Sequence, residues 1–291
     1  MDLNRKIDFA IKLLQSIPQD GPIELSYSGG KDSDVILELA KMSGIPFEAI
    51  YKNTTIDPPG TIAHCKEKNV TILKPKMTFF EIVERNSMPS RWSRFCCKYL
   101  KEYKVYDRAI QGIRRAESVA RSKRYKEPEY CRVFGKGEKV RVYLPILEWT
   151  DTDVAQFIKD RNIKCAPVYY DKNGQFHVER RLGCIGCPLA SDNGKKDFLQ
   201  YPKLLKQIIA AQQRYLDTHP NSKAYAAFNG NAYNCVYKRL FCTTMEEYEM
   251  KISGGLFPEL AIDTKQYLEK IFWNRTLINY LCGNNCVWQR T

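Results

Sequence analysis

The side chains best suited to chemistry lie in one run of the sequence, Ser26-Tyr-Ser-Gly-Gly-Lys-Asp-Ser33. Pro22-Ile-Glu-Leu25, before the run, predicts a short buried strand, and residues 34–42, after it, predict a helix that Gly44 ends. A strand, a glycine turn and a helix place free backbone N–H groups and the positive end of a helix against a phosphate. The run therefore predicts a phosphate-binding loop.

The residue types within this loop agree with that prediction. Gly29 and Gly30 let the backbone approach a ligand without a Cβ, and Lys31 adds positive charge. Asp32 is unusual in an anion site unless a cation, Mg²⁺, lies between its carboxylate and the phosphates. The alternative is a glycine turn before an ordinary helix.

Two commoner phosphate motifs do not match the loop. A Walker A loop needs Ser or Thr after Gly-Lys, where this chain has Asp32, and no Gly-x-Gly-x-x-Gly occurs in the first strand-to-helix turn. The loop resembles the SGGxDS motif of the PP-loop ATP pyrophosphatase superfamily. The resemblance implies an ATP-binding enzyme that adenylates a substrate oxygen, with ATP held by Ser26, Tyr27, Ser28, Gly29, Gly30, Lys31, Asp32 and Ser33.

Paired cysteines form a second constellation. Cys184 and Cys187 have the C-x-x-C spacing that brings two thiolates to one metal, and the distant pair Cys96-Cys97 completes four sulfur ligands. Structural zinc and separate buried cysteines are the alternatives. The pattern resembles the [4Fe–4S] site of adenylylsulfate reductases, in the PAPS reductase-like family, and implies that cluster here. Cys282 and Cys286 stay unassigned.

Further residues resemble the active site of that family. Gly112-Ile-Arg-Arg-Ala-Glu-Ser118, followed by Arg121, resembles its arginine segment, and the alternative is a surface charge cluster. Arg114 and Arg115 could hold phosphates bidentately. The resemblance adds the following nucleotide-binding residues: Thr54, Thr55, Asp57, Gly112, Arg114 and Arg121.

Two differences from the reductases indicate which branch of the family the chain resembles. The chain lacks the Glu-Cys-Gly-Leu-His type of tail that carries the reductase nucleophile, since neither Glu precedes nor His follows Cys282. Its loop is also the complete ATP-using form. An intact loop with a cluster resembles the ATP pyrophosphatases of DNA phosphorothioation, the Dnd and Ssp types, and the cluster-dependent tRNA thiolation enzymes.

These resemblances imply a specific reaction. The chain is expected to adenylate an oxygen of a nucleic-acid backbone or base, with Lys31, Asp32, Arg114 and Arg115 as the catalytic residues, so that sulfur can replace the oxygen. A sulfur donor such as a cysteine desulfurase would be a partner. The alternatives are an APS or PAPS reductase of sulfur assimilation, a tRNA thiolation enzyme, and a non-catalytic nucleic-acid-binding module.

Composition points to the partner and to the compartment. The 291 residues carry a formal charge of +13, which favours a polyanionic partner, with DNA favoured over RNA. Basic residues gather in a stretch from Arg121 to Arg141 that lacks periodicity and predicts a long, partly mobile loop. Eleven cysteines without a secretion signal or a membrane-length apolar run indicate a cytoplasmic protein that does not enter a membrane.

The strands and helices that position these residues are predicted by alternating patterns along the chain. They predict an α/β fold, a doubly wound and mostly parallel sheet, which the resemblance describes as Rossmann-like and close to the adenine nucleotide alpha hydrolases. From about Ala190 the patterns are helical only. We therefore expect a nucleotide-binding domain over 1–189, which includes the cluster cysteines, and a helical region over 190–291.

Overall fold

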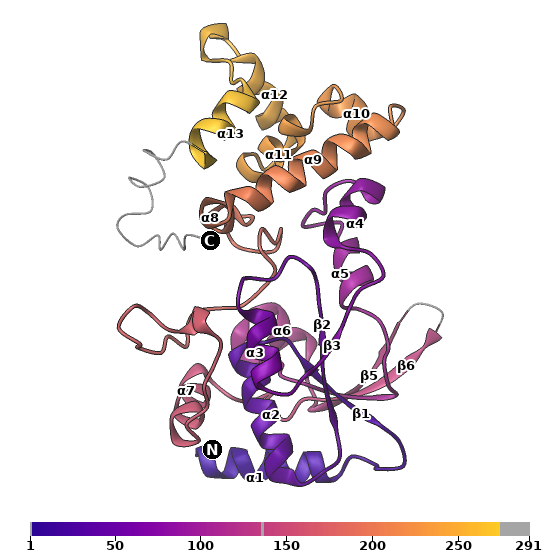
Figure 1. The fold of residues 1–291 in the computed structure, drawn as a ribbon, viewed down its shortest axis with the longest axis vertical. Helices are drawn as coiled ribbons and strands as arrows, with labels where there is room; N and C mark the ends of the chain where they lie inside the picture. The colour runs from indigo at the N-terminus through magenta and orange to yellow at the C-terminus, as the bar shows by residue number, and fades with distance from the viewer. Residues whose placement is uncertain (1, 135–136, 274–291) are drawn as a thin grey trace. The chain divides into compact units, whose positions relative to one another are not determined.

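The computed structural model describes residues 2–134 and 137–273. The chain divides into two compact units, each made of two segments. The sheet unit comprises Met1–Lys76 and Lys98–Gly183, and the helical unit comprises Met77–Cys97 and Cys184–Thr291. Figure 1 shows the strands of the first unit and the helices of the second, and each unit is described by itself.

The sheet unit is built on one sheet of six strands, counted over the described residues, in the order β3-β2-β1-β4-β6-β5. Every neighbouring pair is parallel except β5 with β6, which is antiparallel. The strands are β1 (Ile23–Tyr27), β2 (Glu48–Lys52), β3 (Thr71–Leu73), β4 (Arg108–Gln111), β5 (Glu129–Val133) and β6 (Lys139–Tyr143). The predicted α/β fold with a mostly parallel sheet is confirmed.

Strand order locates the ligand-binding edge of this sheet. From β1 the chain moves outward through β2 to β3, then returns to place β4 on the other side of β1. The carboxyl ends of β1 and β4 thus flank a topological switch point, where open α/β sheets bind their ligands. The loop after β1 lies at this point.

Helices with one buried side connect the strands of this unit. Helix α2 packs on β1, and both α1 and α7 pack on α2 (Figure 1). Val154, Phe157 and Ile158 are buried on α7, as their spacing predicts. The helices of the sheet unit are α1 (Leu3–Gln15), α2 (Lys31–Ser43), α3 (Thr61–Glu67), α6 (Val119–Arg124) and α7 (Asp151–Asp160), with 3₁₀ turns at Arg115–Glu117 and Pro167–Tyr169.

The predicted mobile loop from Arg121 to Arg141 is wrong. Helix α6 extends to Arg124, and β5 pairs with β6 in register from Glu129 opposite Tyr143 to Val133 opposite Lys139. The burial of β5 alternates along the strand, with Tyr130 and Arg132 half-buried. The sequence hides this alternation, because the charged Arg132 occupies a half-buried position while Cys131 and Val133 are exposed.

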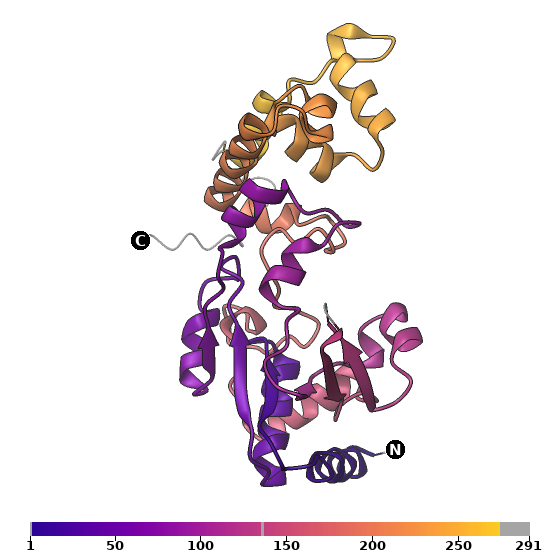
Figure 2. The same ribbon diagram turned by 90° about the vertical axis from the view of Figure 1, so that its right-hand side faces the viewer.

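The helical unit joins segments that lie far apart in the sequence. Helix α4 (Phe79–Asn86) packs along α9 (Pro202–Thr218), and Figure 2 shows the two helices together. The side chain of Gln212 accepts hydrogen bonds from the Ser87 hydroxyl at 3.0 Å and the Met88 N–H at 2.8 Å. The other helices are α5 (Phe95–Leu100), which crosses into the sheet unit, α8 (Lys195–Gln200), α10 (Lys223–Phe228), α11 (Ala232–Phe241), α12 (Met245–Ser253) and α13 (Thr264–Phe272), with a 3₁₀ turn at Pro258–Leu260.

This packing changes the expected domain boundary. The second part of the sheet unit ends at Gly183 rather than at residue 189, and residues 77–97 belong with the helices. The apolar face of α4, with Phe79, Ile82 and Val83 buried, is covered by α9. All four predicted metal-binding cysteines therefore lie in the helical unit. In the part of the chain that is described, no helix is long and apolar enough to cross a membrane.

A capping box at the start of α7 allows a test of this fold. The Thr150 hydroxyl accepts a hydrogen bond from the Asp153 N–H at 3.2 Å, and the Asp153 carboxylate accepts from the Thr150 N–H at 2.7 Å. Thr150→Ala should lower the free energy of unfolding by about 1 kcal/mol, since it leaves helix-end N–H groups unpaired. Thr152→Ala, at an exposed position within the same helix, should change it by less than about 0.5 kcal/mol. Urea unfolding followed by tryptophan fluorescence, to which the buried Trp149 contributes, measures both, and equal losses would contradict the capping role.

Candidate nucleotide site and cysteine group

The predicted phosphate loop has the predicted strand, turn and helix. Strand β1 ends at Tyr27, and α2 begins at Lys31 with Gly30 as its N-cap. Gly29 has a φ of 77°, and a Cβ there would lie 3.0 Å from Thr61 Cγ2. A Cβ on Gly30 would lie 3.2 Å from the Tyr169 hydroxyl. Both glycines are therefore needed for the turn to fit among its neighbours.

Side chains of the loop are held by short-range hydrogen bonds. The Ser28 hydroxyl accepts from the Gly30 N–H at 3.3 Å, and the Ser33 hydroxyl donates to the Gly30 carbonyl at 2.6 Å. Tyr27 points into the core, where its hydroxyl donates to Asp34 at 2.5 Å. Asp34 also contacts the ring of buried His64 at 3.0 Å, so this histidine braces the helix beneath the loop. Burial, followed by the charge of Asp34, raises the pKa of Tyr27 above its ordinary range.

Asp32 and Arg114 form the centre of the site. Arg114 is 1% exposed, and its Nε donates to Asp32 Oδ1 at 2.6 Å while its Nη2 donates to Asp151 Oδ1 at 2.8 Å. Its Nη1 donates to the Trp149 carbonyl at 3.4 Å. Lys31 Nζ lies 3.6 Å from Asp32 Oδ2. Arg114 thus lies beside the loop as predicted. Its contacts favour a role in positioning Asp32 rather than in binding phosphate directly.

Arg115 is also engaged by the protein. Its Nε donates to the Tyr125 carbonyl at 2.7 Å, its Nη2 donates to the Lys126 carbonyl, and its Nη1 pairs with Glu148. These contacts fasten the segment after α6 to the end of β4. They likewise favour a structural role for Arg115 over contact with a nucleotide.

Arg121 and Arg181 add cations near Asp32. Arg121 pairs with Glu117. Burial lowers the pKa of Arg121, and the neighbouring charge of Arg181 lowers it further, which places the two guanidinium groups near each other. The charge of Asp32 raises the pKa of Arg121, and the charge of Arg114 lowers it. Arg181 is missing from the sequence prediction, although its position in Arg180-Arg181 before Gly183-Cys184 is a basic signal that could have indicated it.

The residues predicted after β2 form a turn that Asp57 stabilises. Its carboxylate accepts hydrogen bonds from the Tyr51 hydroxyl and from the Thr54 N–H, the latter at 3.3 Å. Thr55 has a φ of 61°, and its N–H donates to the Asn53 side chain at 2.8 Å. Thr54 is fully buried, so it supports the edge of the site rather than exposing a side chain to it.

A cavity of about 240 Å³ lies on the sheet face next to the loop. Its lining includes Ser26, Tyr27 and Ser28 from the predicted loop. Lys52 crosses it, at 3.2 Å from the buried Glu24 carboxylate and 2.8 Å from the Tyr103 carbonyl. Burial lowers the pKa of Lys52, and Glu24 opposes that effect. The sequence analysis missed Glu24 and Lys52, although ionisable residues inside otherwise apolar strands are a signal for a polar cavity.

The four predicted metal-binding cysteines are neighbours in the helical unit. A hydrogen bond with Cys97 and burial raise the pKa of Cys96, and the charge of Cys184 adds to the effect. Burial lowers the pKa of the Arg239 guanidinium, and the charges of Cys187 and Cys96 oppose that effect. Among the described residues, however, no group of three or more His, Cys, Asp or Glu side chains could hold a metal ion. The side-chain positions thus do not support the predicted cluster, although the thiols share one charged environment.

The turn between Cys184 and Cys187 is tightly packed. Gly186 has a φ of 68°, and a Cβ there would lie 2.0 Å from the Phe198 ring. Its N–H donates to Asp197 Oδ2 at 2.8 Å, and its carbonyl accepts from Arg239 Nη2. The other described cysteines are buried, except the exposed Cys131, and Cys282 and Cys286 lie outside the described residues.

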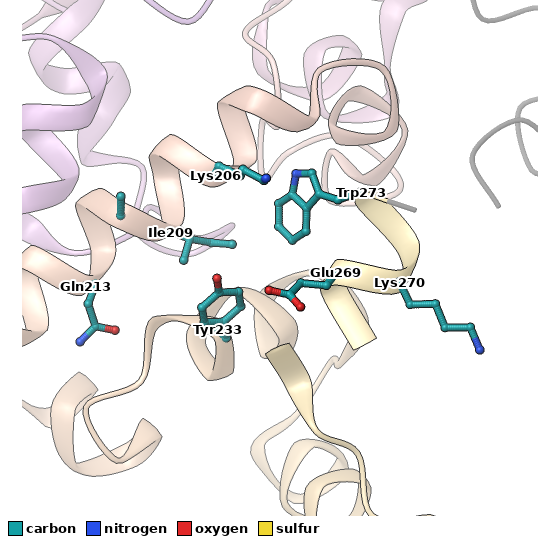
Figure 3. A pocket seen from close by; sticks show the side chains of 8 residues that line it. Lys206, Ile209, Gln213, Tyr233, Glu269, Lys270 and Trp273 are labelled. Atoms are coloured by element: carbon teal, nitrogen blue, oxygen red, sulfur yellow. The ribbon is translucent and has the colours of Figure 1, made fainter. Parts of the chain in front are cut away.

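A larger cavity, of about 760 Å³, lies within the helical unit and is lined by none of the predicted site residues. Figure 3 shows Trp273 and Tyr233 on either side of Ile209, with Glu269 directed between them. Lys206 Nζ lies 5.1 Å from the centre of the Trp273 ring. The cavity combines aromatic rings with lysines.

The approach of β4 to the loop allows a test of the nucleotide site. A Cβ on Gly112 would lie 2.9 Å from the backbone oxygen of Asp32, so Gly112→Ala must displace the start of α2. We expect ATP binding at least about tenfold weaker, since overpacking costs about 1–3 kcal/mol. Gly183→Ala, which adds its Cβ to open space, is the matched control. Calorimetric titration with Mg²⁺ and ATP measures both affinities, and unchanged binding by the Gly112 variant would remove the loop from the ATP site.

Known proteins are similar to part of the chain. An uncharacterized protein of Methanocaldococcus jannaschii is 33% identical over 213 residues, which cover 66% of this chain and 48% of that protein. Sulfate adenylyltransferase subunit 2 of Shewanella pealeana is 28% identical over 186 residues, covering 52% of this chain and 61% of that protein. The chain therefore spans about half to three-fifths of the length of these relatives.

Solved structures match part of the chain at low identity. The FMN adenylyltransferase of Candida glabrata is 18% identical, with a TM-score of 0.40 over 57% of this chain and 58% of that protein. The PAPS reductase of Candida auris is 15% identical, with a TM-score of 0.38 over 56% of this chain and 87% of that protein. The phosphoadenosine phosphosulfate reductase domain model matches residues 22–190, more than half of the chain and the whole of the loop region described above. The chain therefore belongs to the phosphoadenosine phosphosulfate reductase domain family, with a PP-loop nucleotide-binding site.

Proposed function

We propose that the chain uses ATP to adenylate an anionic oxygen of its substrate, with release of pyrophosphate. The observation that carries this proposal is the complete loop at the head of α2, where Lys31 and Asp32 meet Arg114. Family membership supports nucleotide chemistry, and the name of the Shewanella relative supports adenylyl transfer. The complete loop favours ATP over a ready-made adenylate.

The residues have distinct roles in this proposal. The substrate oxygen attacks the α-phosphorus of ATP, the bond to the bridging oxygen breaks, and pyrophosphate leaves with that oxygen. Free N–H groups at the start of α2 and the charge of Lys31 stabilise the leaving pyrophosphate. Arg121 and Arg181 supply further positive charge near Asp32. Arg114 holds Asp32 in place, and a Mg²⁺ ion bound through Asp32 would neutralise phosphate charge.

Two acceptors fit the proposed reaction. Nucleic acid is the first, because the net charge is +13 and because α6 exposes Lys123 and Arg124 beyond the site. In that case sulfur from a donor such as a cysteine desulfurase would replace the adenylated oxygen, which would leave with AMP, as in DNA phosphorothioation. Sulfate is the second, because the Shewanella relative is named a sulfate adenylyltransferase subunit.

Pyrophosphate release tests the ATP chemistry. Purified full-length chain is incubated with Mg²⁺ and ATP, together with DNA, RNA or sulfate, and pyrophosphate is measured. Lys31→Met should lower the rate by roughly 100-fold or more, because it removes a buried positive charge from the leaving group. Lys41→Met, at the exposed far end of the same helix, should leave the rate unchanged.

The outcomes of this assay separate the candidate functions. Release that depends on sulfate favours sulfate adenylation, and release that depends on nucleic acid favours backbone or base modification. Sulfite formed from APS or PAPS with thioredoxin, in place of pyrophosphate from ATP, would favour the reductase. Wild-type rates in the Lys31 variant would remove the loop lysine from catalysis.

Binding to nucleic acid is tested on α6. Lys123, Arg124 and Lys126 are exposed, and the Lys126 ammonium donates to the Ser122 carbonyl at 3.1 Å. Replacing these three residues together by Ala should weaken binding to duplex DNA at every sequence and flatten the dependence on salt by about 0.9 for each lost phosphate contact. Fluorescence anisotropy over a range of salt concentrations measures both effects. Replacing exposed Lys12, Lys41 and Lys66 is the charge-matched control, and an equal loss would indicate net charge rather than a site.

A further inference from the structure

The larger cavity, of about 760 Å³, is lined by side chains of three helices of the helical unit. Its lining includes Lys206 and Ile209 from α9, Tyr233 from α11, and Glu269, Lys270 and Trp273 from the end of α13. All of them lie outside the residues that the family model matches, 22–190. None takes part in the proposed ATP reaction, so the cavity is a separate candidate for a binding site.

The protein holds both aromatic rings of this cavity in place. The Trp273 indole donates from Nε1 to the Pro202 carbonyl at 3.3 Å. Tyr233 lies in the first turn of α11, where the Ala232 N–H donates to the Gln213 side chain of α9 at 3.0 Å. Both rings are half-buried, so part of each remains accessible. Accessible, fixed rings of this kind are the side chains on which unpaired nucleic-acid bases stack.

Positive charge lies against both rings. Lys206 Nζ is 5.1 Å from the centre of the Trp273 ring, and Lys265 Nζ is 5.9 Å from the centre of the Tyr233 ring. Lys206 belongs to α9, whereas Lys265 and Lys270 belong to α13. The cations therefore come from two different walls of the cavity, where they can meet the phosphates on both sides of a stacked base.

Glu269 gives the cavity a means to select among bases. Figure 3 shows its carboxylate directed between the Trp273 and Tyr233 rings. Among residues 137–273 this carboxylate has no ion pair and no hydrogen bond, and an ionised carboxylate can only accept. Guanine presents two adjacent donors, N1–H and the N2 amine, that match the two carboxylate oxygens. Thymine presents one donor between two carbonyl oxygens, which a carboxylate repels.

We propose that this cavity binds an unpaired guanine of a single-stranded nucleic acid. The base stacks on Trp273 and Tyr233, its donor edge meets Glu269, and the flanking phosphates meet Lys206 and Lys270. A strand carries a phosphate on each side of the base, which suits cations on two walls better than a free nucleotide does. The formal charge of +13 agrees with a polyanionic partner. This binding makes and breaks no covalent bond, and it goes beyond the proposed ATP reaction.

Base selection is tested with the full chain and short single strands, without ATP. Fluorescence anisotropy compares an oligo(dT) strand with the same strand carrying one central guanine or one central hypoxanthine, which lacks the N2 amine. The guanine strand should bind about fivefold or more tightly than either other strand. Glu269→Gln should remove most of that preference without weakening binding to oligo(dT), because the lost charge repels phosphate. Glu249→Gln, at an exposed position on α12, is the matched control and should keep the preference.

Stacking and charge are tested in the same assay. Trp273→Leu should weaken binding of the guanine strand roughly tenfold or more, whereas Trp273→Phe keeps a ring and should stay within a few-fold of the wild type. Lys206→Met should reduce the salt slope by about 0.7, the value for one phosphate contact on a single strand. Lys203→Met, exposed on the same helix but outside the lining of the cavity, should leave the slope unchanged. Both lysines are exposed, so these two variants remain informative if Trp273→Leu does not fold.

Three results would overturn the proposal. The first is equal binding of the three strands by the wild-type chain, and the second is unchanged affinity in a Trp273→Leu variant that keeps the wild-type unfolding temperature. The third is free GMP bound as tightly as the guanine strand, which would indicate a nucleotide pocket rather than a strand site. Pyrophosphate is not measured in any arm. Failure of the proposed ATP reaction therefore leaves this inference standing, and the reverse is equally true.

Discussion

The ion pair between Arg114 and Asp32 is the contact on which the nucleotide site depends. Arg114 follows β4, Asp32 lies in the first turn of α2 and Asp151 begins α7, so one buried guanidinium joins three elements through bonds of 2.6 and 2.8 Å. Removal of either carboxylate would leave a buried charge partly unpaired, which is costly. The same contact sets the direction of the Asp32 carboxylate at the loop. Stability of the sheet unit and geometry of the ATP site are therefore coupled through Arg114.

Arg114 and Arg239 differ in how many of their guanidinium nitrogens have a partner in the protein. Arg114 has a protein partner for each of its three nitrogens, so it is complete without a ligand. Arg239 has a partner for one nitrogen only and lies beside thiols. Arg114 is therefore held by the protein alone, whereas two nitrogens of Arg239 have no hydrogen-bond partner.

Local chemistry in the sequence predicted the strands near the loop, the glycine turn and the capped helices, because each depends on neighbouring residues. The phosphate contacts expected of Arg114 and Arg115 depend on distant partners, Asp151 and Glu148, which no local pattern reveals. Strand β5 was missed because its half-buried side carries the charged Arg132 and its exposed side carries Val133, so its apolar residues do not alternate with the burial. The membership of 77–97 in the helical unit follows from its packing on α9, more than a hundred residues later. Arg239 carried no motif at all.

The discontinuous helical unit has a consequence for synthesis on the ribosome. Helix α4 ends at Asn86 and its partner α9 begins at Pro202, so 115 residues (201 − 86) must be translated between them. At a translation rate of about 5–20 residues per second, roughly 6–23 s pass before α9, the helix that covers Phe79, Ile82 and Val83, begins to be synthesised. During that interval the sheet unit is completed while an apolar helix stays uncovered in the nascent chain. Production of this protein is therefore expected to depend on chaperones that bind the nascent chain at α4.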